Sequence, residues 1–250
     1  MAKNIQLGTG LPLFEPRSRH AILLNNYDIF DEYSQANMYC RGNRRVYELE
    51  AVLTGEFQKG PEQFEPTLSE FLLPAWEHEL GLHQKYRPGI KYDSTSRVLP
   101  QTDMRGELDR NLERISRVSS DDTLTFMYLT SHGEIGSFVI NNGEEMGYQD
   151  LLDKLDGVKG KKVIVALACY SGSLVDVWKE RKTKDDYVIL TSTTNREKGI
   201  NWGEDQIHDK VVKNLIARQR VSDLRIPAVI QPVPDDQHHP QIVGSYDVAL

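Results

Sequence analysis

Cysteine is scarce in this sequence, which has only Cys40 and Cys169 among its 250 residues. Two cysteines cannot supply the several bridges of a disulfide framework, so a reducing compartment is the default expectation. The first residues, Met1–Gly8, lack the apolar core of a secretory signal. No apolar run approaches the roughly 20 residues that cross a membrane. These absences together predict a cytoplasmic protein without a membrane partner.

Positive charge is also in short supply, because the formal net charge is −7. This balance argues against nucleic acid as the main partner. We find no internal repeat and no low-complexity tract. A length of 250 residues with 39% hydrophobic residues suits one large α/β domain, or such a domain with an insert.

Two stretches, Thr125–Gly136 and Val163–Ser173, share an unusual pattern. Each begins as a short apolar run and stops at one reactive residue, His132 in the first and Cys169 in the second. A glycine or another small residue follows shortly after. Runs of this length, rich in β-branched and aromatic residues, are typical of buried strands.

The segment between these two strands has apolar residues at helical spacing over Tyr148–Leu155. A strand, a helix and a second strand form a right-handed crossover with a parallel strand pair. Both strands then end at the same edge of the sheet, which is where ligands bind in open α/β sheets. The sequence therefore predicts that His132 and Cys169 meet at one crevice.

The remaining pattern predicts a three-layer α/β/α sandwich with a mostly parallel central sheet, formed by a single domain over residues 1–250. Strands are expected at 20–26, 187–191 and 241–245, helices at 45–53, 102–118, 174–180 and 204–219, and a hairpin closed by Asn142-Gly143. Residues 54–100 break the alternation with many prolines and glycines, so we expect an insert packed on the rim of the sheet. A lid, a docking surface for a regulatory partner or activator, and a structural elaboration all remain open for it.

A thiol attacks as the thiolate, so a neighbouring base must take its proton. His132 supplies such a base for Cys169, and a helix that starts just after Cys169 would stabilise the anion. Backbone N–H groups of Gly133 and Cys169 would form an oxyanion hole. The competing interpretation is a small buried cysteine and a loop histidine. The matched strand ends favour catalysis.

Metal binding and cofactor binding are not expected. His78 and His83 stand five residues apart, so they leave a common helical face. His238 and His239 lack further ligands at a useful spacing.

The two motifs resemble those of the caspase-like superfamily of cysteine peptidases, which includes caspases, metacaspases and legumain-type endopeptidases. The superfamily marks are His-Gly after one strand and Ala-Cys or Ser-Cys after the next, and here they stand at His132-Gly133 and Ala168-Cys169. The resemblance covers roughly residues 20–53 and 102–219. It implies the caspase-haemoglobinase-like fold and a Cys169–His132 dyad.

The sequence departs from that resemblance around the substrate pocket. Leu167 stands where metacaspases and legumain carry an acidic residue, and Asn43-Arg44 stands where metacaspases carry another acid. Arg41 falls near the place of a caspase arginine that binds an acidic substrate residue. We therefore expect Arg41 to bind substrate, with an acidic or hydrogen-bonding residue before the cut. Acids elsewhere remain alternatives that would favour a basic substrate residue: Asp28, Glu204 and Asp205.

The expected function is that of a cysteine endopeptidase that cleaves proteins or peptides through a thioester on Cys169, in a regulated cytosolic role. Two alternatives remain. One is a catalytically silent relative that acts as a binding module. The other is a transpeptidase or ligase that uses the same thioester.

Overall fold

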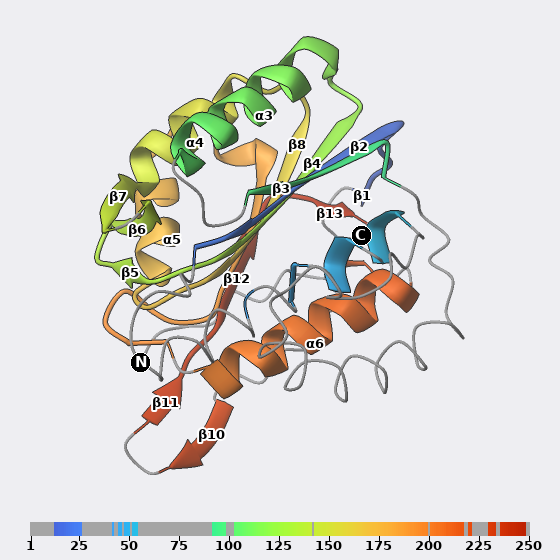
Figure 1. Cartoon of the computed structure of the whole chain (residues 1–250). Coiled ribbons are helices and arrows are strands. Elements are labelled where there is room, and N and C mark those ends of the chain that lie inside the picture. The colour runs from blue at the N-terminus through green and yellow to red at the C-terminus, as the bar shows by residue number, and fades with distance from the viewer. Residues whose placement is uncertain are drawn as a thin grey trace, which may run out of the picture.

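The computed structural model describes residues 13–26, 42, 45–46, 48–50, 52–54, 92–98, 103–141, 143–199, 201–217, 220–221, 230–233 and 236–248. Within these residues the chain is organised around a six-stranded sheet (Figure 1). Its strands lie in the order β12 (Gln241–Gly244), β9 (Tyr187–Thr191), β8 (Lys161–Leu167), β4 (Thr123–Thr130), β2 (Ser18–Asn25) and β3 (Ser94–Val98).

The sheet is mostly parallel, as the sequence predicts. The strands β9, β8, β4, β2 and β3 all run in the same direction, and only β12 pairs antiparallel, with β9. Every residue of β4 is buried, as is nearly every residue of β2 and β8. Strands that are covered on both faces have continuous apolar sequences, and β2, β4 and β8 were predicted from that pattern.

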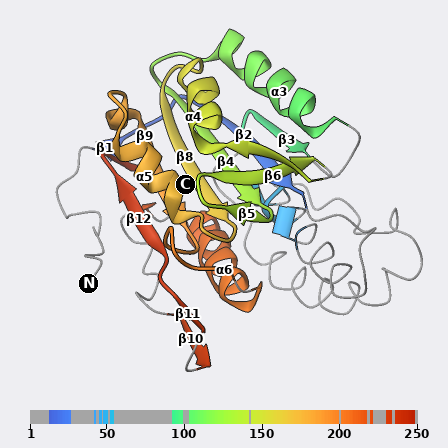
Figure 2. The ribbon, with the colours of Figure 1, turned by 90° about the vertical axis from the view of Figure 1, so that its left-hand side faces the viewer.

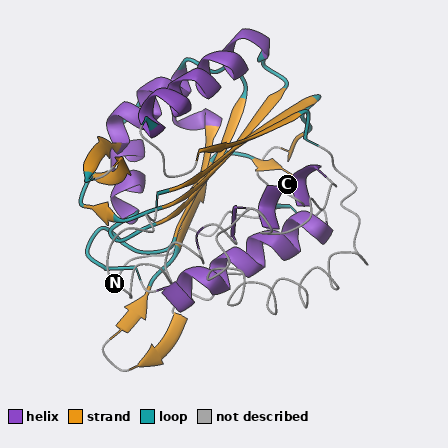
Figure 3. Cartoon of the chain, viewed as in Figure 1, coloured by secondary structure: helices purple, strands orange, loops and turns teal. Residues whose placement is uncertain are grey.

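Helices cover both faces of the sheet (Figures 1 and 3). One face packs against α3 (Met104–Val118), α4 (Tyr148–Asp156) and α5 (Gly172–Lys179). The opposite face packs against α6 (Asn201–Ala217) and against the helical residues described between 45 and 54. The predicted three-layer sandwich with a mostly parallel central sheet is confirmed.

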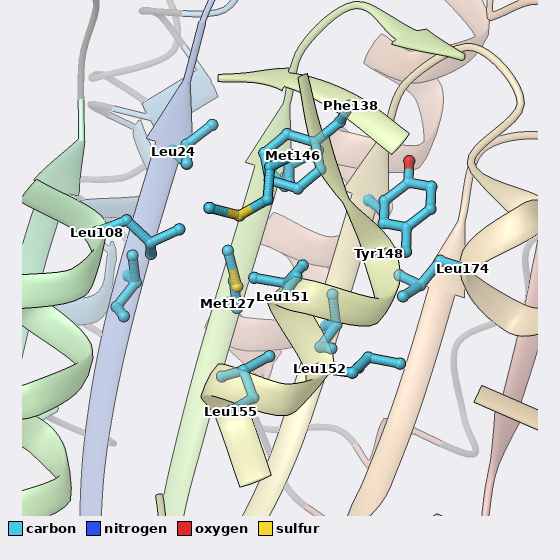
Figure 4. Close-up of a cluster of buried hydrophobic side chains, with 14 of the residues drawn as sticks. Leu24, Leu108, Met127, Phe138, Met146, Tyr148, Leu151, Leu152, Leu155 and Leu174 are labelled. Atoms are coloured by element: carbon cyan, nitrogen blue, oxygen red, sulfur yellow. The ribbon is translucent and has the colours of Figure 1, made fainter. Parts of the chain in front are cut away.

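The core under α4 shows how the crossover helix docks on the sheet (Figure 4). Leu151, Leu152 and Leu155 are fully buried at helical spacing and belong to the same cluster as Met127 of β4. Tyr148, at the start of α4, stacks on a ring of the small hairpin sheet, that of Phe138, with centroids 5.8 Å apart. This apolar face seats α4 between β4 and β8, so the crossover holds the ends of these two strands beside each other.

A small antiparallel sheet continues from the end of β4 (Figure 2). It contains β5 (Gly133–Glu134), β6 (Ser137–Asn141) and β7 (Glu144–Gly147). The turn between β6 and β7 contains Gly143, whose φ of +79° is accessible mainly to glycine, and this confirms the predicted hairpin. The remaining elements are β1 (Leu13–Phe14) paired with β13 (Asp247–Val248), β10 (Ile230–Val233) paired with β11 (Asp236–His238), and a 3₁₀ turn at Lys184–Asp186.

One strand of the sheet lies where the sequence pattern predicts an insert. Residues 94–98 pair with β2 in parallel and form the edge strand β3. The sequence of β3, Ser-Thr-Ser-Arg-Val, has a single apolar residue, and only that residue, Val98, is buried. Because an edge strand needs little apolar surface, this one left no hydrophobic run to recognise. Residues 55–91 of the expected insert lie outside the described residues.

Candidate active site

The carboxyl ends of β4 and β8 lie side by side at one edge of the central sheet. Thr130, the last residue of β4, is in register with Leu167, the last residue of β8. The Ser131 N–H donates to the Leu167 carbonyl oxygen at 3.2 Å and continues the pairing beyond the strands. His132 and Cys169 each follow the Thr130–Leu167 pair by two residues. The register therefore brings their backbones to the same point of the sheet edge.

The chain at Gly133 packs directly onto the chain at Cys169. A Cβ atom on residue 133 would lie 2.3 Å from the Cys169 carbonyl oxygen and 3.1 Å from the Ala168 Cβ. Such an approach is shorter than van der Waals contact, so any side chain here would displace the backbone. Gly133 thus allows the segment that carries His132 to lie against the segment that carries Cys169.

Hydrogen bonds fix the hairpin that follows His132. The His132 carbonyl oxygen accepts from the Val139 N–H at 2.9 Å, and the Ser131 hydroxyl donates to the Val139 carbonyl oxygen at 2.6 Å. At the tip of the hairpin, the Gly136 N–H donates to the Ser173 hydroxyl at 2.9 Å. That hydroxyl in turn donates to the Tyr170 carbonyl oxygen at 2.7 Å. The histidine hairpin and the turn after Cys169 are therefore joined through one serine.

The backbone directly after Cys169 is strained. Tyr170 has a φ of +54°, which is costly for a residue with a Cβ atom. Its N–H donates to the Glu197 carbonyl oxygen at 2.7 Å, and α5 begins two residues later at Gly172. Strain of this kind persists only where the surrounding contacts impose it, and it concentrates at functional sites.

The segment Thr194–Gly199, which follows β9, forms a third side of the site. The Gly199 N–H donates to the Cys169 sulfur at 3.2 Å. The Glu197 carboxylate accepts from the backbone N–H groups of Thr194 and His239, at 3.0 and 3.2 Å, and it also pairs with the His239 ring. No local sequence pattern identifies this segment, because its contacts join residues far apart in the chain.

Partial burial shifts the pKa of both proposed dyad residues toward their neutral forms. Burial raises the pKa of the Cys169 thiol, the Gly199 N–H lowers it, and the nearby carboxylate of Glu204 raises it again. Loss of water around His132 lowers the pKa of its imidazole. At neutral pH these shifts favour a thiol beside a neutral imidazole, which is able to accept a proton.

A buried ion-pair network lies on the α6 side of the sheet. The Arg45 side chain has no exposed surface, and its NH1 group contacts Glu204 Oε2 at 2.9 Å and Thr130 Oγ1 at 3.1 Å. Its NH2 and Nε groups contact Asp205 Oδ1 at 2.9 and 3.0 Å. Burial raises the pKa of the Glu204 carboxyl, and Arg45 opposes that shift. Two of the three acids considered for a basic-residue pocket, Glu204 and Asp205, are thus already engaged by an arginine.

The structure describes only part of the predicted substrate pocket. Leu167 is fully buried in the core cluster beneath the sheet, where an acid would lack water. The other pocket and loop residues considered from the sequence lie outside the described residues, namely Asp28, Cys40, Arg41, Asn43, Arg44, His78 and His83. Among the residues that are described, no group of three or more metal-binding side chains is found.

A mostly parallel sheet between two helical layers, with His-Gly and Ala-Cys at adjoining strand ends, is the arrangement of the caspase-like superfamily of cysteine peptidases. A comparison with protein families finds a member of that superfamily in part of the chain. Residues 102–218, just under half of the chain, match the Peptidase C13 family, the legumain family. The matched segment contains His132, Cys169, Gly199 and Glu204. It supports cysteine peptidase activity or the related transpeptidase or ligase activity.

No curated protein matches the chain. In the described part of the chain, none of the helices is both long and apolar enough to cross a membrane.

Proposed function

We propose that the protein is a cysteine endopeptidase in which Cys169 is the nucleophile and His132 the general base. The observation that carries the proposal is the register of β4 with β8, which brings both residues to one edge of the sheet. In the first step His132 takes the thiol proton and the sulfur attacks the substrate carbonyl carbon. The tetrahedral intermediate then collapses to a thioester while His132 returns the proton to the leaving amine. Water next attacks the thioester, with His132 as base, and releases the acid and the free thiol.

The Gly133 N–H is the proposed oxyanion donor, together with the N–H of Cys169. Residues 132 and 139 are joined by a backbone hydrogen bond, whereas the next pair along the hairpin is Gly133 with Phe138. Hydrogen-bonded and non-hydrogen-bonded pairs alternate in antiparallel strands, so this alternation directs the Gly133 N–H away from β6. An N–H group that is not used inside the hairpin supports a role in holding the oxyanion.

A peptide-library digest analysed by mass spectrometry tests the reaction. Cys169→Ala and His132→Ala should each lower turnover by several orders of magnitude, because no other group replaces the nucleophile or its base. Cys40→Ala removes the other cysteine of the sequence and should retain turnover. Full activity of Cys169→Ala would refute the scheme, and products cut only at chain termini would refute endopeptidase action. The absence of turnover in the wild-type protein would favour the silent binding module.

The family match includes related transpeptidase and ligase activity, so joining of peptides is the second candidate function. The same thioester would be attacked by an amine in place of water. Incubation of the enzyme with a cleavable peptide and an excess of a second peptide amine distinguishes the two outcomes. Hydrolysed ends support the peptidase, and joined ends support the ligase.

For specificity we propose an acidic or hydrogen-bonding residue before the cut, bound by Arg41, in a cytosolic and regulated setting. Two features of the described residues support this choice: Leu167 is a core residue, and both Glu204 and Asp205 are engaged by Arg45. A basic substrate residue would lack a carboxylate partner from these positions, and an unpaired buried charge is costly. The scarcity of cysteine supports the cytosolic setting.

Matched peptides that differ only in Asp, Asn, Leu or Arg before the cut measure this preference. We expect kcat/KM to be highest for Asp or Asn and to fall by about 10-fold or more for them in Arg41→Ala, since a charge-assisted hydrogen bond is lost. A strong preference for Arg that Arg41→Ala does not change would place the pocket elsewhere.

A further inference from the structure

Gly199 packs closely against a buried carboxylate and against the backbone of the proposed nucleophile. A Cβ atom on residue 199 would lie 2.6 Å from Glu204 Oε1 and 3.2 Å from the Cys169 backbone nitrogen. The N–H of this glycine donates to the Cys169 sulfur at 3.2 Å. Glu204 Oε1 therefore lies close to the residue whose amide contacts the sulfur.

Arg45 holds the carboxylate of Glu204 in place through a buried ion pair. Glu204 is 2% exposed and Arg45 is not exposed at all, and Glu204 Oε2 receives the Arg45 NH1 group at 2.9 Å. The other carboxylate oxygen, Oε1, is the one that faces Gly199. Arg45 also contacts Thr130 at the end of β4, so the support for Gly199 is tied to the strand that carries His132.

We propose that Glu204 is a positioning residue for the Cys169 nucleophile: its Oε1 supports Gly199 so that the amide is directed at the sulfur, while Arg45 fixes the carboxylate and offsets its charge. This inference rests on the proposed function in one respect, namely that Cys169 is the nucleophile. It adds a contact from a different element, α6, which neither the strand-end motifs nor the family match assigns a role.

The two effects of Glu204 on the thiol have opposite signs. The Gly199 N–H stabilises the thiolate, so the support that Glu204 gives to that amide favours ionisation of the sulfur. The negative charge of Glu204 disfavours ionisation. The other ionisable groups around the sulfur lie on separate elements and stay unchanged in the experiment below: Glu134 of β5, Tyr148 of α4, Lys198 of the 194–199 segment, and His132 after β4.

The thiol pKa, measured from the pH dependence of alkylation by iodoacetamide, separates these effects. The protein carries Cys40→Ala, so that Cys169 is its only cysteine. Glu204→Gln keeps the shape of the side chain but removes its charge, so the midpoint should fall by about half a pKa unit. Glu204→Asp keeps the charge but withdraws the carboxylate from Gly199 by one methylene, so the midpoint should rise by about the same amount.

Opposite shifts in the two variants support the proposal, and no shift, or shifts in the same direction, would overturn it. Asp209→Asn changes an exposed acid on the same helix and is the matched control, which should leave the midpoint in place. Thermal unfolding of each variant verifies that the fold is intact. Alkylation needs no substrate, so this result stands apart from the peptide digest: a protein that shows opposite shifts but cleaves no peptide refutes the proposed function alone.

Discussion

At the scale of single residues, the site depends on two glycines that admit close backbone contact. Gly133 lies against the Cys169 carbonyl, and Gly199 lies close to Glu204 and to the Cys169 backbone. The first is visible in the sequence, because a glycine after a strand-end histidine is a local pattern. The need for a glycine at position 199 is not visible in the sequence. It comes from Cys169, 30 positions earlier, and Glu204, five positions later, which only the folded chain brings together.

Gly133→Ala gives the residue-scale prediction. The added methyl group would meet the Cys169 carbonyl oxygen at 2.3 Å, so the hairpin must move away from Cys169. We expect a loss of about 1–3 kcal/mol in the free energy of unfolding, measured in urea, together with a marked fall in kcat. Gly147→Ala is the matched control, because a Cβ atom there meets nothing closer than 3.9 Å and the residue has φ of −65°. Equal behaviour of the two variants would contradict this account.

At the scale of elements, the structure shows which signals in the sequence were sufficient to predict a helix or a strand. Buried strands with apolar runs, such as β4 and β8, and helices with one apolar face, such as α3 and α4, were predicted within a few residues of their observed bounds. The edge strand β3 was not, because its outward-facing residues are polar. No sequence pattern indicates that a buried arginine holds α6 in place. Arg45 and Glu204 are far apart in the sequence, and charged residues ordinarily lie at the surface.

Arg45→Met tests that docking. Removal of one partner from a buried ion pair leaves Glu204 without its cation, so we expect a loss of about 3–5 kcal/mol in the free energy of unfolding near neutral pH. Without Arg45 the already raised pKa of Glu204 in the folded state rises further, whereas in the unfolded chain it stays near the ordinary value. The loss of stability of Arg45→Met relative to the wild type should therefore grow as pH rises above about 4.5.

Urea unfolding at pH 5 and pH 8 measures this deficit. The double variant Arg45→Met with Glu204→Gln should recover part of the stability at pH 8, because no buried charge remains unpaired there. A deficit that is the same at both pH values would show that packing, and not the unpaired carboxylate, accounts for the loss.

At the scale of the whole molecule, the pH dependence of activity follows from how the folded chain surrounds the dyad. Burial lowers the pKa of His132 and raises that of Cys169, so the proposed resting dyad is uncharged. We expect kcat/KM to fall on the acid side with a midpoint below 6.5, where His132 becomes protonated, and to hold a plateau through pH 8. Ultraviolet absorbance of a thiolate already present at neutral pH would contradict this account, because it would indicate a preformed thiolate–imidazolium pair.

The contact between Glu197 and His239 has a consequence for how the protein is made. The strained turn after the cysteine is bonded to Glu197, and the carboxylate of Glu197 is held by a residue much closer to the C-terminus. During translation, His239 is added to the chain only after the residues of β4 and β8 have been synthesised. A nascent chain would thus contain Cys169 before the turn that follows it can be completed, and the local arrangement of the candidate site would form only after residue 239 has been added.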